Sequence, residues 1–173
     1  MFDACVLYNI SPDEKRQFHI HTGSAKIADD LKFQKNDIVF LSPKTDDVLD
    51  KGLKMGLPSG VINAELLYPK DSLQHVKGGI DDSAANFMFE KKIALVFNLN
   101  LLLTSEHSKR GRIIRRMAEN MKRAVKYDLP VLFASCAKDK YELFNGSEIK
   151  AWANYLGIDN FERVRVSFEK LFK

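Results

Sequence analysis

Short runs of consecutive apolar residues alternate along the chain with segments whose apolar positions recur at helical spacing. The apolar runs are rich in Val, Ile, Leu and Phe, and they predict strands over residues 2–8, 18–21, 37–41, 61–67, 93–99 and 129–135. An unbroken apolar run is typical of a strand buried on both faces, because a half-exposed strand alternates polar and apolar residues. The pattern therefore predicts a largely parallel sheet.

Between and after these runs, apolar residues three and four positions apart predict helices over 46–55, 81–89, 109–127, 147–156 and 161–172. The first is expected to end at Gly56 and the second to begin at Asp81 or Asp82. The fourth is expected to begin at Ser147 and to stop at Gly157.

This alternation predicts an α/β fold in a single domain over residues 1–173. Two architectures fit it: a closed or incomplete TIM-like (β/α) barrel, and an open doubly wound sheet. Barrels of this kind usually need at least about 200 residues, so a barrel in this chain is expected to be compact or incomplete.

Composition excludes several classes of protein. With 45% hydrophobic and 29% charged residues in 173, the chain can bury a core without disulfides, which excludes a disordered or collagen-like protein. Cys5 and Cys136 both lie in apolar runs, as expected for reduced core thiols in a cytosolic protein. No apolar run approaches the roughly 18 residues of a membrane span, so we expect a soluble, cytoplasmic protein without a membrane partner.

The net charge of +4 is unevenly distributed. Residues 1–100 carry a net charge of −2, whereas residues 101–173 carry +6. The segment 105–126 alone has eight basic residues against Glu106 and Glu119. Such a local excess of positive charge points to a polyanionic partner.

The basic residues of this segment fall on one predicted helix. At 100° per residue, one stripe is apolar (Ile113, Ile114, Met117, Met121, Ala124 and Val125) and the opposite one is basic (Arg112, Arg115, Arg116, Lys122, Arg123 and Lys126). Arginine forks bind phosphate oxygens bidentately, so this face, together with Arg110, predicts contact with a nucleic-acid backbone. A solvated face and a protein or membrane surface remain the alternatives.

The end of the 129–135 run carries a second set of candidate residues. Ser135-Cys136-Ala137-Lys138 matches S-x-x-K, but the motif ends a strand instead of opening a helix, so a catalytic serine is not expected. Ser135 and Lys138 could still meet a ligand at the carboxyl end of the strand. Lys138 and Lys140 could hold phosphates while a base stacks on Tyr141.

His19 and His21 form an H-x-H pair on a predicted strand, where both imidazoles would share one face. Such a pair could chelate zinc or manganese, but a metal site needs further ligands. Exposed or hydrogen-bonded histidines are the favoured interpretation, and no protein-bound metal or cofactor is expected.

Residues 79–158 resemble the C-terminal half of the ribonuclease P protein component 3 family, the archaeal counterparts of the nuclear p30 subunit. The resemblance follows, in order, GIDDSAANFMFEKKIALVFNLNLLL, the basic helix that contains Arg110, the strand closing in Ala-Ser-Cys-Ala, and DKYEL before a further helix. Four positions depart from the family pattern. Val96 and Asn100 replace a frequent glutamate and arginine, and Phe144 and Gly146 stand where the family has arginine and then proline.

This resemblance implies a TIM-like barrel related to the PHP phosphoesterases, without a working metal centre and with a shortened N-terminal half. It further implies an RNA-binding, non-catalytic subunit of the ribonucleoprotein that removes the 5′ leader from precursor tRNA. There the RNA is the catalyst and uses Mg²⁺. The implied partners are the ribonuclease P RNA, the small ferredoxin-like component 2, in a heterodimer or heterotetramer, and other ribonuclease P subunits. The alternatives are a small PHP-like metal-dependent phosphoesterase using His19 and His21, and a pure protein scaffold.

Overall fold

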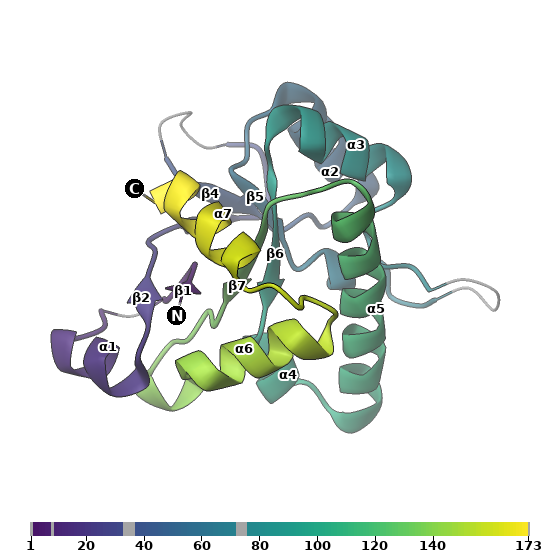
Figure 1. The fold of residues 1–173 in the computed structure, drawn as a ribbon. Helices are drawn as coiled ribbons and strands as arrows, with labels where there is room; N and C mark the ends of the chain where they lie inside the picture. Colours follow the sequence, from purple (N-terminus) through teal and green to yellow (C-terminus); the bar gives the residue numbers. More distant parts are fainter. Residues whose placement is uncertain (1, 8, 33–36, 72–75, 173) are drawn as a thin grey trace.

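A computed structural model describes residues 2–7, 9–32, 37–71 and 76–172 (Figure 1). Its main sheet has five strands in the order β3-β4-β5-β6-β7, and every neighbouring pair is parallel. The strands are β3 (Lys26–Ala28), β4 (Val39–Leu41), β5 (Gly60–Ile62), β6 (Ala94–Asn98) and β7 (Val131–Ala134). The predicted α/β fold with parallel strands is confirmed.

A second, two-stranded ladder pairs β1 (Phe2–Asp3) with β2 (His21–Thr22), again in parallel. The chain after β1 also runs beside β7, because the Ala4 N–H donates to the Phe133 carbonyl (2.8 Å) and the Cys136 N–H donates to the Cys5 carbonyl (2.9 Å). Residues 23–25 alone separate β2 from β3. The two-stranded ladder is thus joined to the main sheet by hydrogen bonds beside β7 and by a short chain segment before β3. The two ladders remain distinct, and a closed barrel stays a prediction.

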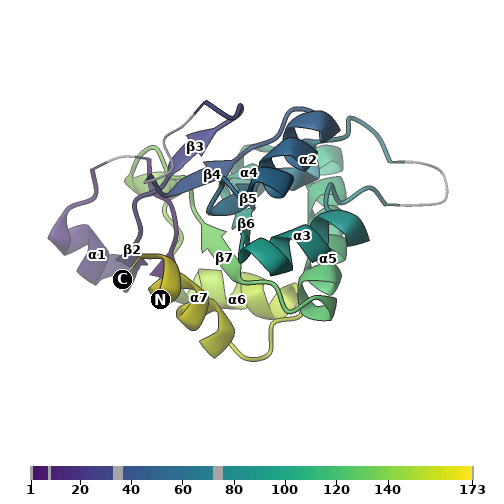
Figure 2. The ribbon, with the colours of Figure 1, turned by 90° about the horizontal axis from the view of Figure 1, so that it is seen from above.

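Helices form a layer over one face of the main sheet (Figure 2). They are α2 (Asp46–Met55), α3 (Asp82–Lys91), α5 (His107–Lys126) and α6 (Gly146–Tyr155). Leu95 and Phe97 of β6 point into this core, whereas Val96, between them, belongs to a second core that includes Phe168 of α7 (Glu162–Phe172). Strand β6 is therefore buried on both faces, as its unbroken apolar run predicted.

Two predicted strands are wrong in whole or in part. Residues 18–21 do not form one strand, because a capping box between Ser11 and Glu14 begins helix α1 (Pro12–Phe18). His19 then ends that helix with φ 53°, and β2 begins at His21. The predicted strand 61–67 stops after β5, because Asn63 is left-handed with φ 60° and the short 3-10 helix η1 (Ala64–Leu66) follows.

The predicted helices are confirmed with small changes at their ends. Asp81 caps α3, and Asn145, not Ser147, caps α6. The predicted strand 2–8 is reduced to β1, and Tyr8 lies outside the described residues. Strand β3, helix α4 (Asn100–Thr104) and the 3-10 helix η2 (Lys140–Glu142) were not predicted. None of the helices in the described part of the chain is long and apolar enough to cross a membrane.

Candidate nucleic-acid interface

The candidate interface is α5, which packs against the sheet through one face and presents basic residues on the other. Ile113, Met117, Met121 and Ala124 are buried in the main core, as predicted. Val125 was expected on the same stripe, but it is 54% exposed. The burial of the apolar stripe fixes which side chains of this helix can meet a partner.

In the C-terminal half of α5, acidic residues already compensate the exposed cations. Lys122 pairs with Glu119 at 2.6 Å, and Lys126 pairs with Asp82 of α3 at 3.0 Å. Arg123 lies 3.9 Å from the same Asp82. The Lys126 ammonium holds the pKa of Asp82 below its usual range. This half is therefore close to neutral.

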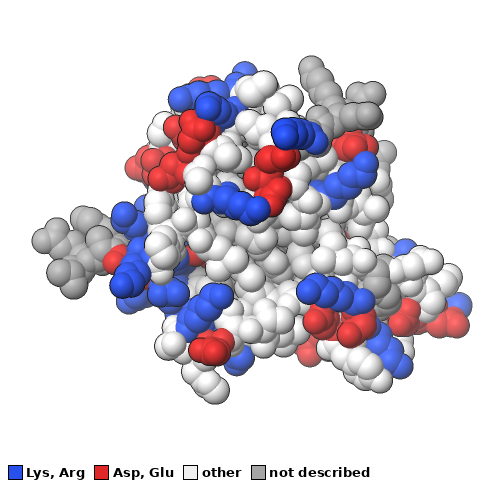
Figure 3. All heavy atoms as spheres, turned by 180° about the vertical axis from the view of Figure 1, so that it is seen from behind, with Lys and Arg blue, Asp and Glu red and all other residues white. Residues whose placement is uncertain are grey.

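The N-terminal half of α5 is different. Within the described part of the chain, no carboxylate forms an ion pair with Lys109, Arg110 or Arg112. The Arg115 side chain is 63% exposed, and its Nη2 atom lies 3.4 Å from the Oδ2 atom of Asp71. The first turn has no acidic residue, so these cations add to the positive end of the helix dipole instead of opposing it. In Figure 3, Lys and Arg gather along the edge that α5 forms, at the left of that view.

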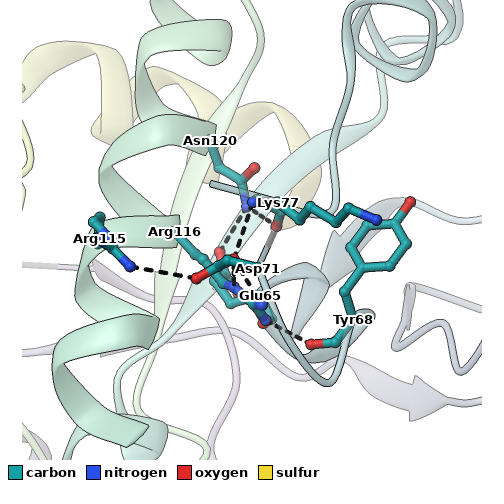
Figure 4. A network of polar contacts seen from close by, with 8 residues as sticks. Glu65, Tyr68, Asp71, Lys77, Arg115, Arg116 and Asn120 are labelled. Atoms are coloured by element: carbon teal, nitrogen blue, oxygen red, sulfur yellow. Dashed lines mark hydrogen bonds and ion pairs between the residues drawn. The ribbon is translucent and has the colours of Figure 1, made fainter. Parts of the chain in front are cut away.

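Arg116 is not on the exposed face where the basic stripe placed it. Its side chain is 2% exposed, and it forms a 2.8 Å ion pair with Asp71 (Figure 4). It also donates hydrogen bonds of 2.7 Å to the backbone carbonyls of Glu65 and Tyr68. The helical spacing explains the burial, because Arg116 lies three residues after Ile113 and four before Asn120, both of which are buried. The guanidinium thus joins α5 to the loop after η1.

Asn120, one turn further along α5, extends this network. Its side-chain amide donates to the Glu65 carboxyl at 3.0 Å and to the Gly78 carbonyl at 2.8 Å (Figure 4). The adjacent Gly79 lies so close to η1 that a Cβ on it, at φ 98°, would lie 2.0 Å from the Ala64 carbonyl oxygen. The polar residues on the buried side of α5 therefore position the loop that covers it.

Glu65 is the unusual member of the network, because it is an acid with 0% exposure. Burial raises the pKa of its carboxyl to about 7, against the opposing effects of the Asn120 hydrogen bond and the Arg116 charge. The carboxyl therefore ionises near neutral pH in the folded protein.

We expect this ionisation to make the stability depend on pH. Between the ordinary carboxyl pKa of 4.5 and about 7, the folded protein keeps a proton that the unfolded chain has lost. The free energy of unfolding should therefore fall as the pH rises through this window. In Glu65→Gln, which cannot ionise, this fall should be smaller. Urea unfolding of both proteins at pH 4.5, 6 and 8 measures it, and parallel pH profiles would contradict the assignment.

The residues predicted at the end of β7 are only partly brought to the surface. Ser135 is fully buried, where its N–H donates to Asp3 and its hydroxyl accepts from the Ala137 N–H. It cannot meet a ligand without rearrangement, so that expectation is corrected. Lys138 and Lys140 are exposed, and the Lys140 ammonium lies 5.1 Å from the centre of the Tyr141 ring. Tyr141 is 84% exposed, as stacking with a base requires.

A row of hydrogen-bonded polar side chains crosses the carboxyl ends of β4, β5 and β6 and extends to η2, and sequence reasoning missed it. Asn98 donates to Asn63 at 2.8 Å, and Asn63 donates to Ser42 at 2.9 Å. Asn100 donates to Glu142 at 2.8 Å. Each amide residue follows or ends an apolar run, which was the available signal. Asn100, which departs from the family pattern, is thus held by Glu142.

The histidine pair does not share a strand face. His19 ends α1, whereas His21 is exposed on β2 and stacks on Phe2 with ring centres 5.3 Å apart. Among the described residues, no group of three or more His, Cys, Asp or Glu side chains is arranged to hold a metal ion. The other departures from the family pattern have structural roles: Phe144 is buried, and Gly146 is the first residue of α6.

Comparison with known proteins finds several archaeal relatives. The chain is 31% identical over 78 residues to ribonuclease P protein component 3 of Methanocaldococcus jannaschii, which is 45% of this chain and 34% of the relative. It is 24% identical over 143 residues to the Methanococcus maripaludis component 3 (82% and 62%). It is 31% identical over 112 residues to that of Methanosarcina mazei (62% and 47%). The chain thus spans about one to two thirds of their lengths. No family model matches the chain.

A solved structure matches the whole fold. A chain of the cryo-EM structure of archaeal ribonuclease P with mature tRNA superposes with a TM-score of 0.72 at 19% identity. The match covers 99% of this chain and 78% of that one. It shows that the N-terminal half, where the sequence resemblance is weak, shares the fold.

Proposed function

Since the chain belongs to the ribonuclease P protein component 3 family, we propose that it is an RNA-binding protein subunit of ribonuclease P. In this role it supports the catalytic RNA in removing the 5′ leader from precursor tRNA. No side chain of the protein cleaves the bond, and Mg²⁺ acts with the RNA. The chain assembles with component 2 in a heterodimer or heterotetramer and with other subunits. Its two ladders correspond to an incomplete TIM-like barrel related to the PHP enzymes.

The observation that carries the proposal is the unbalanced charge at the start of α5. Lys109, Arg110 and Arg112 have no acidic partner in the described part of the chain, although Lys122, Arg123 and Lys126 on the same helix do. Opposite charges at i,i+3 or i,i+4 spacing stabilise a solvated helix face, as Glu119 and Lys122 do, and such pairs are missing from the described contacts of Lys109, Arg110 and Arg112. Phosphates neutralise such cations and release counterions, which gives RNA binding its affinity and salt dependence. The first half of α5 is therefore the RNA contact.

Reconstitution tests the proposal directly. The chain, component 2 and the ribonuclease P RNA from one organism are combined, and cleavage of precursor tRNA is followed over a range of Mg²⁺ concentrations. We expect the chain to lower the Mg²⁺ concentration that half-maximal cleavage requires, because it neutralises phosphates in the folded RNA. A matched reaction contains component 2 and RNA without the chain. Identical Mg²⁺ profiles would overturn the proposed role.

A further inference from the structure

Helix α1, the β1–β2 ladder and α7 lie at the opposite end of the molecule from α5 (Figures 1 and 2). Residues of these elements line an open hollow. Its volume is about 980 Å³, near the upper limit of the roughly 300–1,000 Å³ that is typical of ligand sites. Aromatic residues line it, and basic side chains lie at its rim. Neither the α5 interface nor the row of amides at the strand ends extends into it.

The aromatic residues of the hollow form a continuous row. The His21 imidazole stacks on the Phe2 ring with an interplanar angle of 24°. The Phe2 ring lies 4.9 Å from Phe168, whose ring lies 4.7 Å from Phe172. Phe168, within the row, is buried, whereas His21 is exposed at one end. An aromatic stack that ends at the surface is the feature on which unpaired bases stack.

The rim of the hollow is basic. Lys15 and Arg16 come from the last turn of α1. The ion pair of Arg16 with Asp13 is 79% and 88% exposed, so it contributes little and a stronger anion can replace it. The acid that lines the hollow, Glu169, pairs at 2.9 Å with Arg165, which also pairs with Glu162, so Lys15 and Arg16 outnumber it at the rim. The rim therefore favours an anionic ligand.

We propose that this hollow binds an unpaired nucleotide, with its base against His21 and Phe2 and its phosphate between Lys15 and Arg16. The assignment rests on the proposed function, because it gives that RNA a second contact remote from α5. A nucleotide uses both the stack and the cations. An apolar protein segment would cover the aromatic row and leave Lys15 and Arg16 without a role.

Binding of a labelled oligouridylate of about ten nucleotides to the full chain, followed by fluorescence anisotropy, tests the inference. Lys15→Glu with Arg16→Glu should weaken this binding about tenfold or more. Lys51→Glu with Lys54→Glu on α2 changes the charge equally and should have little effect. Because His21 is exposed, His21→Ala should fold normally but bind more weakly, and His21→Phe should restore binding by restoring the stack.

Photocrosslinking locates the site independently. A 4-thiouridine oligonucleotide should crosslink to the peptide that contains Phe2 or His21, as mapped by mass spectrometry. Crosslinks confined to other peptides, or equal binding by all variants, would overturn the hollow as a nucleotide site. Weaker binding by Lys15→Glu with Arg16→Glu, but equal binding by His21→Ala, would show charge without stacking and would also overturn it. Substitutions in α5 alter a different surface. A failure of the α5 prediction would therefore contradict the proposed function without changing the outcome of this binding test.

Discussion

Replacing Arg116 with alanine should lower the free energy of unfolding by about 3–5 kcal/mol, because the change breaks a buried ion pair from one side. Asp71 would lose the closer of its two arginine partners, and the carbonyls of Glu65 and Tyr68 would lose the donor that both share. Domains are typically stable by about 5–15 kcal/mol, so the loss is a large fraction of the total. Urea unfolding followed by circular dichroism measures it.

Arg115→Ala is the matched control for this prediction. Arg115 contacts the same Asp71, but it is 63% exposed and more distant, at 3.4 Å. An exposed pair of this kind contributes about 0–1 kcal/mol, so the variant should unfold almost like the wild type. Arg116→Lys keeps the charge but not the planar fork, and an intermediate loss is expected. If Arg115→Ala and Arg116→Ala were equally stable, Arg116 would not hold the loop.

The sequence predicted those parts of the fold in which burial alone determines the pattern. The first four residues of β6 are all apolar, because Leu95 and Phe97 pack into the helix-covered core while Val96 packs into the second core, which includes Phe168 of α7. Short apolar runs are less decisive, because two or three apolar residues fit a helix end as well as a strand. Residues 18–21 illustrate this: Phe18 ends α1, and the S-x-x-E capping box at Ser11 was the signal that identifies the helix.

The sequence predicted the positive charge of the candidate site, but it did not predict which acidic residues form ion pairs with its arginines and lysines. The helix wheel placed Arg116 between Arg112 and Ile113, at the border of the two faces, and its residue type assigned it to the basic one, although the residue is buried. Its burial depends on Asp71, 45 residues away in sequence, and no local pattern reveals that contact. In the same way, Asp82 neutralises Lys126 from another helix. Tertiary ion pairs therefore decide which cations remain available for an anionic partner.

Charge reversal in the first half of α5 should have the largest effect on RNA binding. In Lys109→Glu, Arg112→Glu, Arg115→Glu, three phosphate contacts would become repulsive. The affinity for the ribonuclease P RNA should fall on the order of 100-fold, and the slope of log affinity against log salt should decrease by about 2–3. Fluorescence anisotropy at several salt concentrations gives both values. These side chains lie outside the core, so the variant should remain folded, which circular dichroism verifies.

Two comparisons separate a specific surface from general electrostatics. Lys51, Lys54 and Lys91 are exposed on α2 and α3. Changing all three to Glu alters the net charge by the same amount as the triple change in the first half of α5. Reversal of Lys122 and Lys126 affects the same helix, where Glu119 and Asp82 already neutralise the cations. If RNA contacts the first half of α5, both of these variants should bind RNA more tightly than the variant with Lys109, Arg112 and Arg115 reversed. Equal losses in the two variants with three reversed charges would mean that RNA senses only the net charge, and α5 would then have no special position in the complex.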